Sequence, residues 1–182
     1  LADAGFHVVA GTGVGLSNQW FLRSSAPFLD DVRVRHALQR LIDRDTIVET
    51  LYTDSCSPAT SVLAPRTFGY EDVSDGFPYD PDAAAALLDE AGFTGRDGDG
   101  YRTKDGRRLA IKTFIDVYDN TAKSLFQAVQ QQLKDAGIDL QLHELDYSTY
   151  WATAFKDPEV GFLRVGWPHP DPSRGLQQYY SK

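Results

Sequence analysis

Strand-like and helix-like segments alternate over residues 109–167, and this alternation constrains the fold more than any other feature of the sequence. Residues 109–115 form an apolar, β-branched run. Residues 138–144 carry an apolar side chain at every second position, and residues 161–167 form a last short run. Apolar residues recur at helical spacing in the two intervening segments, 120–136 and 146–155. Strands that alternate with helices predict an α/β sheet with parallel pairing.

The first part of the chain adds two expected strands and two expected helices. Residues 6–10 and 16–22 are apolar runs with aromatic residues, joined by the glycine-rich GTGVG at 11–15. Residues 30–52 begin as an amphipathic helix, and Asp43 is placed to cap a second one. The apolar residues that set the helical spacing of the first helix are Val34, Ala37, Leu38, Leu41 and Ile42.

Residues 53–79 show little periodicity, so we expect a long surface loop there. The helix that follows has clear boundaries: Asp80 is the expected N-cap, Pro81 occupies the first helical position, and Gly92 ends the helix. The turn signals within 97–106 then predict a β-hairpin.

Length and composition predict one α/β domain over residues 1–182, because 182 residues are enough to bury a core. The net charge of −8, with scattered basic residues, argues against nucleic acid or an anionic membrane as partner. Cys56 is the only cysteine, so neither an intrachain disulfide nor a cysteine-rich metal site is expected. The four histidines lack metal-ligand spacing, and we predict neither a metal nor a cofactor.

No apolar segment reaches the roughly 18 residues of a membrane span. The sequence contains no methionine and opens at Leu1, almost directly into a strand-like run. We therefore expect a piece of a longer protein, with any targeting segment outside it.

Three stretches, taken in chain order, resemble one protein family. Residues 28–52 are similar to a helix pair with the pattern D-D-V-R-x-A-x-x-x-A-I-D-R. Residues 79–93, YDPDAAAALLDEAGF, resemble its Y-D-P-x-x-A-x-x-L-L-x-x-A-G-[FW] helix, and DGDGYRTKDGRRLAI resembles the following hairpin. Residues 132–151, then GW and DP, resemble the family's approach to its ligand cleft. The family is that of extracellular solute-binding proteins of ABC transporters for peptides and nickel, family 5.

The resemblance implies a periplasmic-binding-protein-like fold of the dipeptide-binding type (type II), in which two lobes close over a ligand. This chain corresponds to the C-terminal lobe, a mixed sheet flanked by helices, truncated at both ends relative to the family. The implied function is solute capture for an ABC importer, with a peptide or other small polar solute as ligand. The implied partner is a permease, reached through a full-length monomeric protein in the periplasm or anchored as a surface lipoprotein.

Trp167 is the first candidate ligand-binding residue. Taken alone, a tryptophan at a strand end is more often a core residue. In the family, however, the G-W pair lines the cleft, which implies that the Trp167 indole presents a flat apolar face and one N–H donor to a ligand.

The loop after Trp167 departs from the family. Peptide binders read G-W-x-x-D-x-x-D-P, where the first Asp pairs with the ammonium group of the peptide. Here the loop is G-W-P-H-P-D-P, and its single acid, Asp171, aligns with the second Asp. His169 stands near the place of the first, and a neutral imidazole cannot replace a carboxylate. We expect little affinity for a free peptide N-terminus unless Asp171 has taken over that role.

Three further residues are candidates for ligand contact. Asp116 and Tyr118 follow the strand at 109–115 in a loop that faces the cleft in the family, although a solvated acid without a role is an equal alternative for Asp116. Asn18 alternates with Trp20 along an early strand and can reach the cleft or hinge, whereas Trp20 fits core packing better.

Other interpretations of the sequence have less support. In GTGVG, Leu16 takes the place of a third glycine and a strand follows, so a dinucleotide loop is rejected. DGDGYRTKDGRR lacks the ligands of a calcium loop. A hydrolytic enzyme is disfavoured, because no G-x-S-x-G motif and no Ser or Cys beside a His occurs. A sensory or regulatory domain with the same fold stays open as an alternative.

Overall fold

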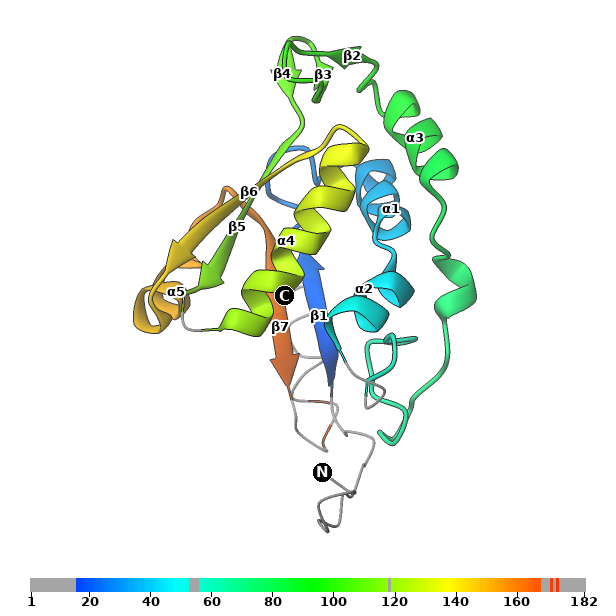
Figure 1. Ribbon diagram of the computed structural model, residues 1–182, viewed down its shortest axis with the longest axis vertical. Coiled ribbons are helices and arrows are strands. Elements are labelled where there is room, and N and C mark those ends of the chain that lie inside the picture. The colour runs from blue at the N-terminus through cyan, green and yellow to red at the C-terminus, as the bar shows by residue number, and fades with distance from the viewer. Residues whose placement is uncertain (1–15, 53–55, 118, 168–170, 172, 174–182) are drawn as a thin grey trace.

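The computed structural model describes residues 16–52, 56–117, 119–167, 171 and 173, and within these it leaves out the side chains of residues 16–19 and 165–167. The elements follow the expected order (Figure 1). The strands are β1 Leu16–Leu22, β2 Gly95–Arg96, β3 Arg102–Lys104, β4 Arg107–Arg108, β5 Ala110–Asp116, β6 Asp139–Leu145 and β7 Val160–Trp167. The helices are α1 Val32–Leu41, α2 Arg44–Leu51, the 3₁₀ turn η2 Ser74–Gly76, α3 Pro81–Glu90, α4 Asn120–Asp135 and α5 Tyr147–Thr153.

The main sheet has the strand order β1-β7-β5-β6. Strand β5 pairs in parallel with both β6 and β7, and β1 pairs antiparallel with β7. The expected α/β sheet with parallel pairing is therefore confirmed, and the sheet is mixed. The expected strand at 6–10 lies outside the described residues.

Helices cover both faces of this sheet. Helices α1, α2 and α4 contribute to the larger hydrophobic cluster, in which Trp20 of β1 packs against Phe126 of α4 and Phe162 of β7. Helix α5 lies on the opposite face, where its Tyr150 belongs to a second, smaller cluster. The remaining members of that second cluster are Phe114, Ala154, Val160 and Leu163. Core packing of Trp20, as predicted, is confirmed.

The capping predictions for the first helices are confirmed. The Asp43 carboxylate accepts a hydrogen bond from the Thr46 N–H at 3.0 Å, which begins α2. Asp80 caps α3 by accepting from the Ala83 N–H at 2.9 Å, and Pro81 takes the first position. After α3 the chain reverses at Gly92, whose φ of 94° lies in the left-handed region that favours glycine.

The predicted hairpin is part of a separate three-stranded antiparallel sheet, β2-β3-β4. Arg102 of β3 joins this small sheet to the main body, because its backbone N–H donates to the Gly137 carbonyl at 2.7 Å. Gly137, with φ 85°, follows the end of α4, directly after the segment 120–136 for which the sequence predicts a helix.

Most of the described part of residues 53–79 is irregular, as predicted, but it is not wholly a surface loop. Leu63, Ala64 and Thr67 are buried. Local turns make this possible: the Thr67 N–H donates to the Ala64 carbonyl at 2.8 Å, so that backbone polar groups stay paired where the segment folds inward.

Candidate ligand-binding site

The parallel strands of the main sheet end along one edge. Because β6 and β7 are both parallel to β5, their last residues, Asp116, Leu145 and Trp167, lie at the same end of the sheet. Strand β1 is antiparallel, and its first residue, Leu16, pairs with Trp167. We call this the carboxyl edge: the edge at which β5, β6 and β7 end and β1 begins (Figure 1).

The carboxyl edge contains a topological switch point. Helix α4 connects β5 to β6 across one face of the sheet, and α5 connects β6 to β7 across the other. The chain therefore leaves the neighbouring strands β5 and β6 toward opposite faces. In open α/β sheets, ligands bind outside the carboxyl ends of the strands at such a point. The topology thus makes this edge the candidate site.

Three predicted ligand-binding residues belong to strands at or near the carboxyl edge. Asp116 is the last residue of β5 and is half-buried, and Trp167 is the last residue of β7. Asn18 lies in β1, two positions beyond Leu16. The side chains of Asn18 and Trp167 are outside the description, so their contact with a ligand stays a prediction.

The other three predicted residues carry less structural information. Tyr118 and His169 lie outside the described residues. Asp171 is exposed, and its carboxylate accepts a hydrogen bond from the Ser173 N–H at 2.9 Å, as a short polar side chain does in a turn. Its role also stays a prediction.

The structure adds Arg164, which sequence reasoning missed. Arg164 lies in β7, and its guanidinium donates to the Asp119 carboxylate at 2.7 Å. Asp119 follows β5 and caps α4 by accepting from the Ala122 N–H at 2.8 Å. The buried Nε of Arg164 has no hydrogen-bond partner among the described residues. A cation paired with Asp119 therefore lies near the end of β5.

Hydrogen bonding and burial have opposite effects on the pKa of Asp119 at this edge. Burial raises the pKa of Asp119, but hydrogen bonds from the Ala122 N–H and Arg164 outweigh it, so that the pKa lies below the ordinary value of 3.8. Burial also raises the pKa of Tyr150, whose hydroxyl donates to the Arg164 carbonyl at 3.3 Å. At neutral pH the edge thus holds a charged Asp119–Arg164 pair beside a neutral phenol.

Replacing Asp119 by Asn is expected to reduce stability at neutral pH and to flatten its decline in acid. Because the folded-state pKa of Asp119 is lowered, its stabilisation is complete above 3.8 and is lost as the pH falls through the folded-state pKa. Urea unfolding from roughly pH 6 to roughly pH 2 measures this difference. The exposed Asp75, replaced in the same way, is the control, and parallel curves for the two variants would contradict the role of Asp119.

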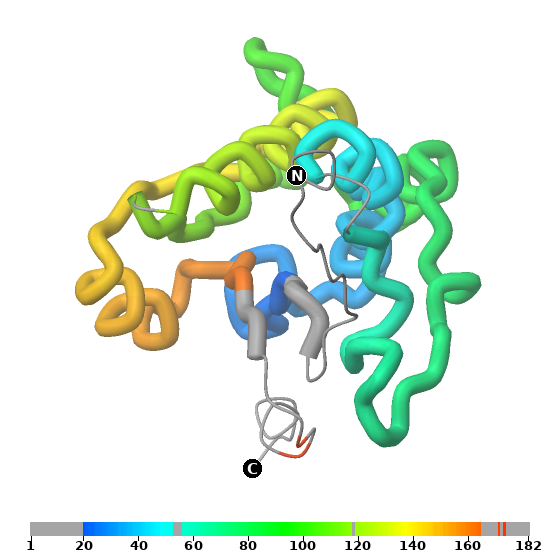
Figure 2. The backbone as a smooth tube through the Cα atoms, turned by 60° about the horizontal axis from the view of Figure 1, so that its bottom comes forward, coloured from blue at the N-terminus to red at the C-terminus, as the bar shows by residue number. Residues whose placement is uncertain are grey.

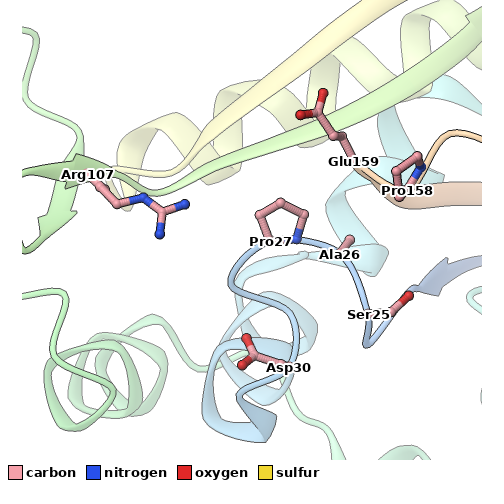
Figure 3. A pocket seen from close by; sticks show the side chains of 7 residues that line it. All are labelled: Ser25, Ala26, Pro27, Asp30, Arg107, Pro158 and Glu159. Carbon is pink, nitrogen blue, oxygen red and sulfur yellow. The ribbon is translucent and has the colours of Figure 1, made fainter.

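A hollow lies at the end of the sheet opposite the carboxyl edge (Figure 3). Its walls include Pro27 after β1, Arg107 before β5 and Glu159 before β7. The Arg107 guanidinium lies over the Phe28 ring, 4.8 Å from its centre. This hollow is shallow, its charged residues are exposed, and it is remote from the carboxyl edge, so we assign no ligand to it.

Within the described part of the chain, no group of three His, Cys, Asp or Glu side chains is placed to hold a metal ion. Among the helices described, none has the length and apolar character that crossing a membrane requires.

A mixed sheet with helices on both faces and a switch point at the carboxyl edge defines the class of α/β ligand-binding domains. Residues 3–182 match the family model described as bacterial extracellular solute-binding proteins, family 5 Middle. The chain belongs to this family, and the resemblance found in the sequence is confirmed.

Individual relatives agree with this assignment. The chain is 29% identical to the dipeptide-binding protein of Escherichia coli K12 over 139 residues, 76% of this chain and 24% of that protein. It is 31% identical to di/tripeptide-binding protein 2 of Pseudomonas aeruginosa over 135 residues, 74% of this chain and 23% of that protein.

Solved structures show the same fold. The crystal structure of NikA from Brucella suis in complex with Fe(III)-EDTA has a TM-score of 0.78 and 28% identity, covering 90% of this chain and 33% of that one. The oligopeptide-binding protein AppA from Bacillus subtilis, at 22% identity and a TM-score of 0.76, supports the fold alone; the match covers 89% of this chain and 32% of that one. The chain thus spans about a quarter to a third of the length of these relatives.

Proposed function

We propose that residues 1–182 form the C-terminal ligand-binding lobe of a larger solute-binding protein, which captures a small polar solute for an ABC importer. Family membership supports solute binding, and the share of its relatives that the chain covers fits one lobe. The relatives' names supply the candidate solutes, peptides and a metal chelate. The larger protein is a monomer that works outside the cytoplasm, in the periplasm or as a surface lipoprotein.

One observation carries the proposal: the chain enters β1 and leaves β7 side by side at the carboxyl edge, where Leu16 pairs with Trp167. A second lobe joined through both connections therefore faces the strand ends. Two adjacent connections between the lobes also form a hinge, about which the lobes open and close. The hinge and the ligand position predicted by the switch point then coincide.

The residues assigned to the ligand follow from this geometry. Trp167, Asp116 and Asn18 are the proposed contacts on the strands, and Tyr118, His169 and Asp171 are proposed from the sequence. Arg164, paired with Asp119, adds a positive charge near the end of β5. An edge that carries both signs suits a polar solute with separated charges. The proposal includes no chemical step.

The experiment is a thermal-shift screen of the full-length protein with free dipeptides, N-acetylated dipeptides and metal chelates such as Fe(III)-EDTA. At a free concentration of 100 times its Kd, a captured solute stabilises the protein by about 2.7 kcal/mol. We expect such a solute among the last two classes, and little effect of free dipeptides, because the loop after Trp167 lacks the acid that holds an ammonium group.

Trp167→Ala is expected to abolish the shift, and Tyr79→Ala, which removes a half-exposed ring from the loop before α3, is the control. If no solute of the three classes raises the melting temperature, capture of peptides and chelates is contradicted. A strong dipeptide effect that Asp171→Asn removes would show that Asp171 holds the ammonium group.

A further inference from the structure

Helix α5 presents a line of exposed aromatic side chains. Tyr147, Trp151 and Phe155 follow one another at intervals of four residues, so they lie along one side of the helix and the turn after it. These residues are 60%, 44% and 50% exposed. The Trp151 and Phe155 rings stack with centres 5.8 Å apart, and Tyr147 meets Trp151 edge-on at 6.1 Å. We call these three residues the aromatic ridge.

The aromatic ridge lies outside the buried core of the lobe, and among the described residues its one ring contact with that core is Trp151 against Tyr150, edge-on at 5.3 Å. Helix α5 is anchored to the sheet through Tyr150 and Ala154, which are 8% and 0% exposed. Both belong to the second hydrophobic cluster, whereas none of the three ridge residues does. The three large rings remain about half exposed to water. Burying them against a partner would therefore lower the free energy through the hydrophobic effect.

The position of the aromatic ridge shows what can reach it. Helix α5 begins directly after the carboxyl edge: β6 ends at Leu145, and Asp146 caps the helix. It stands at the side of the molecule away from α1 and α3 (Figure 2). The chain enters β1 and leaves β7 at this same edge, and β5 separates β7 from β6, so a lobe joined at this edge reaches α5 across the ends of β5 and β6.

The surface area of the aromatic ridge indicates whether a second copy of the chain or another part of the same polypeptide can cover it. At these exposures its rings offer on the order of 300 Å² of surface. A stable association of separate molecules buries about 800 Å² on each partner. The ridge alone is therefore too small for a second copy of the chain. Two parts of one polypeptide meet at a high effective concentration, so a small contact is sufficient between them.

We propose that the aromatic ridge is the docking surface for the facing lobe of the same polypeptide. This inference rests on the proposed function, because it requires a second lobe joined at the carboxyl edge. The relatives extend to about three times the length of this chain, so they contain the polypeptide that such a lobe needs. The facing lobe contributes apolar side chains that cover the three rings.

Hydroxyl-radical footprinting, read residue by residue in a mass spectrometer, tests the contact. The full-length protein is compared with the isolated 182-residue chain. Modification of Tyr147, Trp151 and Phe155 is expected to fall about fivefold in the full-length protein, in proportion to the loss of exposure. Phe68 and Tyr79, 90% and 50% exposed and distant from α5 in the sequence, are internal controls whose rates remain unchanged.

Tyr147→Glu separates docking from a structural role. Tyr147 is the first residue of α5, where a negative charge interacts favourably with the helix dipole, so the isolated chain keeps or gains stability. In the full-length protein the charge opposes an apolar contact, and the modification rates of Trp151 and Phe155 return to those of the isolated chain. A role only in the lobe's own packing predicts the reverse, destabilisation of the isolated chain. Tyr79→Glu is the matched control.

Equal modification of the aromatic ridge in the isolated chain and the full-length protein overturns the inference. It is overturned in the same way if the ridge becomes protected only after permease vesicles are added. Dimers of the isolated chain in sedimentation, abolished by Tyr147→Glu, overturn it in favour of a second copy. Failure of the proposed function is a separate result: the ridge is then protected in the full-length protein, but no solute of the thermal-shift screen is bound.

Discussion

Phe162→Ala is expected to lower the free energy of unfolding by about 3 to 5 kcal/mol. Phe162 is 1% exposed and lies in β7, the strand between β1 and β5. Its ring stacks on Trp20 of β1 at 5.1 Å and meets Phe126 at 6.4 Å, so that it joins β1 and β7 to α4. The rigid neighbours on both sides prevent collapse of the cavity, and the loss lies above that of a lone methylene deletion.

Urea unfolding of the 182-residue chain measures the loss, with Phe68→Ala as the control of identical chemistry. Phe68 is 90% exposed, and its removal is expected to change stability by less than about 0.5 kcal/mol. If both variants unfold at the same urea concentration, the main core is not centred on the Phe162 ring.

The helices could be predicted from sequence because their signals are local. Asp43 and Asp80 cap helices within three residues of themselves, and Pro81 fixes its own backbone angle. Strand order is not local. Nothing in residues 160–167 indicates that this strand pairs with β1 on one side and β5 on the other, because such pairing is decided by packing between distant segments.

Part of the candidate site could be predicted, for the same reason. That Asp116 and Trp167 share an edge follows from parallel pairing of the strands that they end. Arg164 could not be assigned, because its partner Asp119 lies 45 residues away and only the fold brings the two together. The aromatic spacing of Tyr147 and Trp151 was visible, but helical spacing alone cannot show which side of a helix faces the sheet.

Arg102→Ala is expected to lower the free energy of unfolding by about 2 to 4 kcal/mol, the second large effect. Arg102 is only 8% exposed, and its guanidinium binds at the ends of two helices. It donates to the Ala136 carbonyl at the end of α4, at 3.2 Å, and to the Phe93 carbonyl after α3, at 2.9 Å. It also donates to the Asp89 carboxylate.

We expect the loss of stability to come from the missing hydrogen bonds to the two carbonyls and not from the missing ion pair. Helix ends leave carbonyl groups without partners inside the helix, and a buried cation there satisfies them and interacts favourably with both dipoles. Asp89 is 55% exposed, so water replaces its partner, and Asp89→Asn is expected to change stability by less than about 1 kcal/mol. Arg66→Ala, which removes an exposed arginine from the irregular segment before α3, is the control for removing a positive charge. Chemical denaturation of the three variants distinguishes the sources, because equal losses for Arg102→Ala and Asp89→Asn would assign the stabilisation to the ion pair.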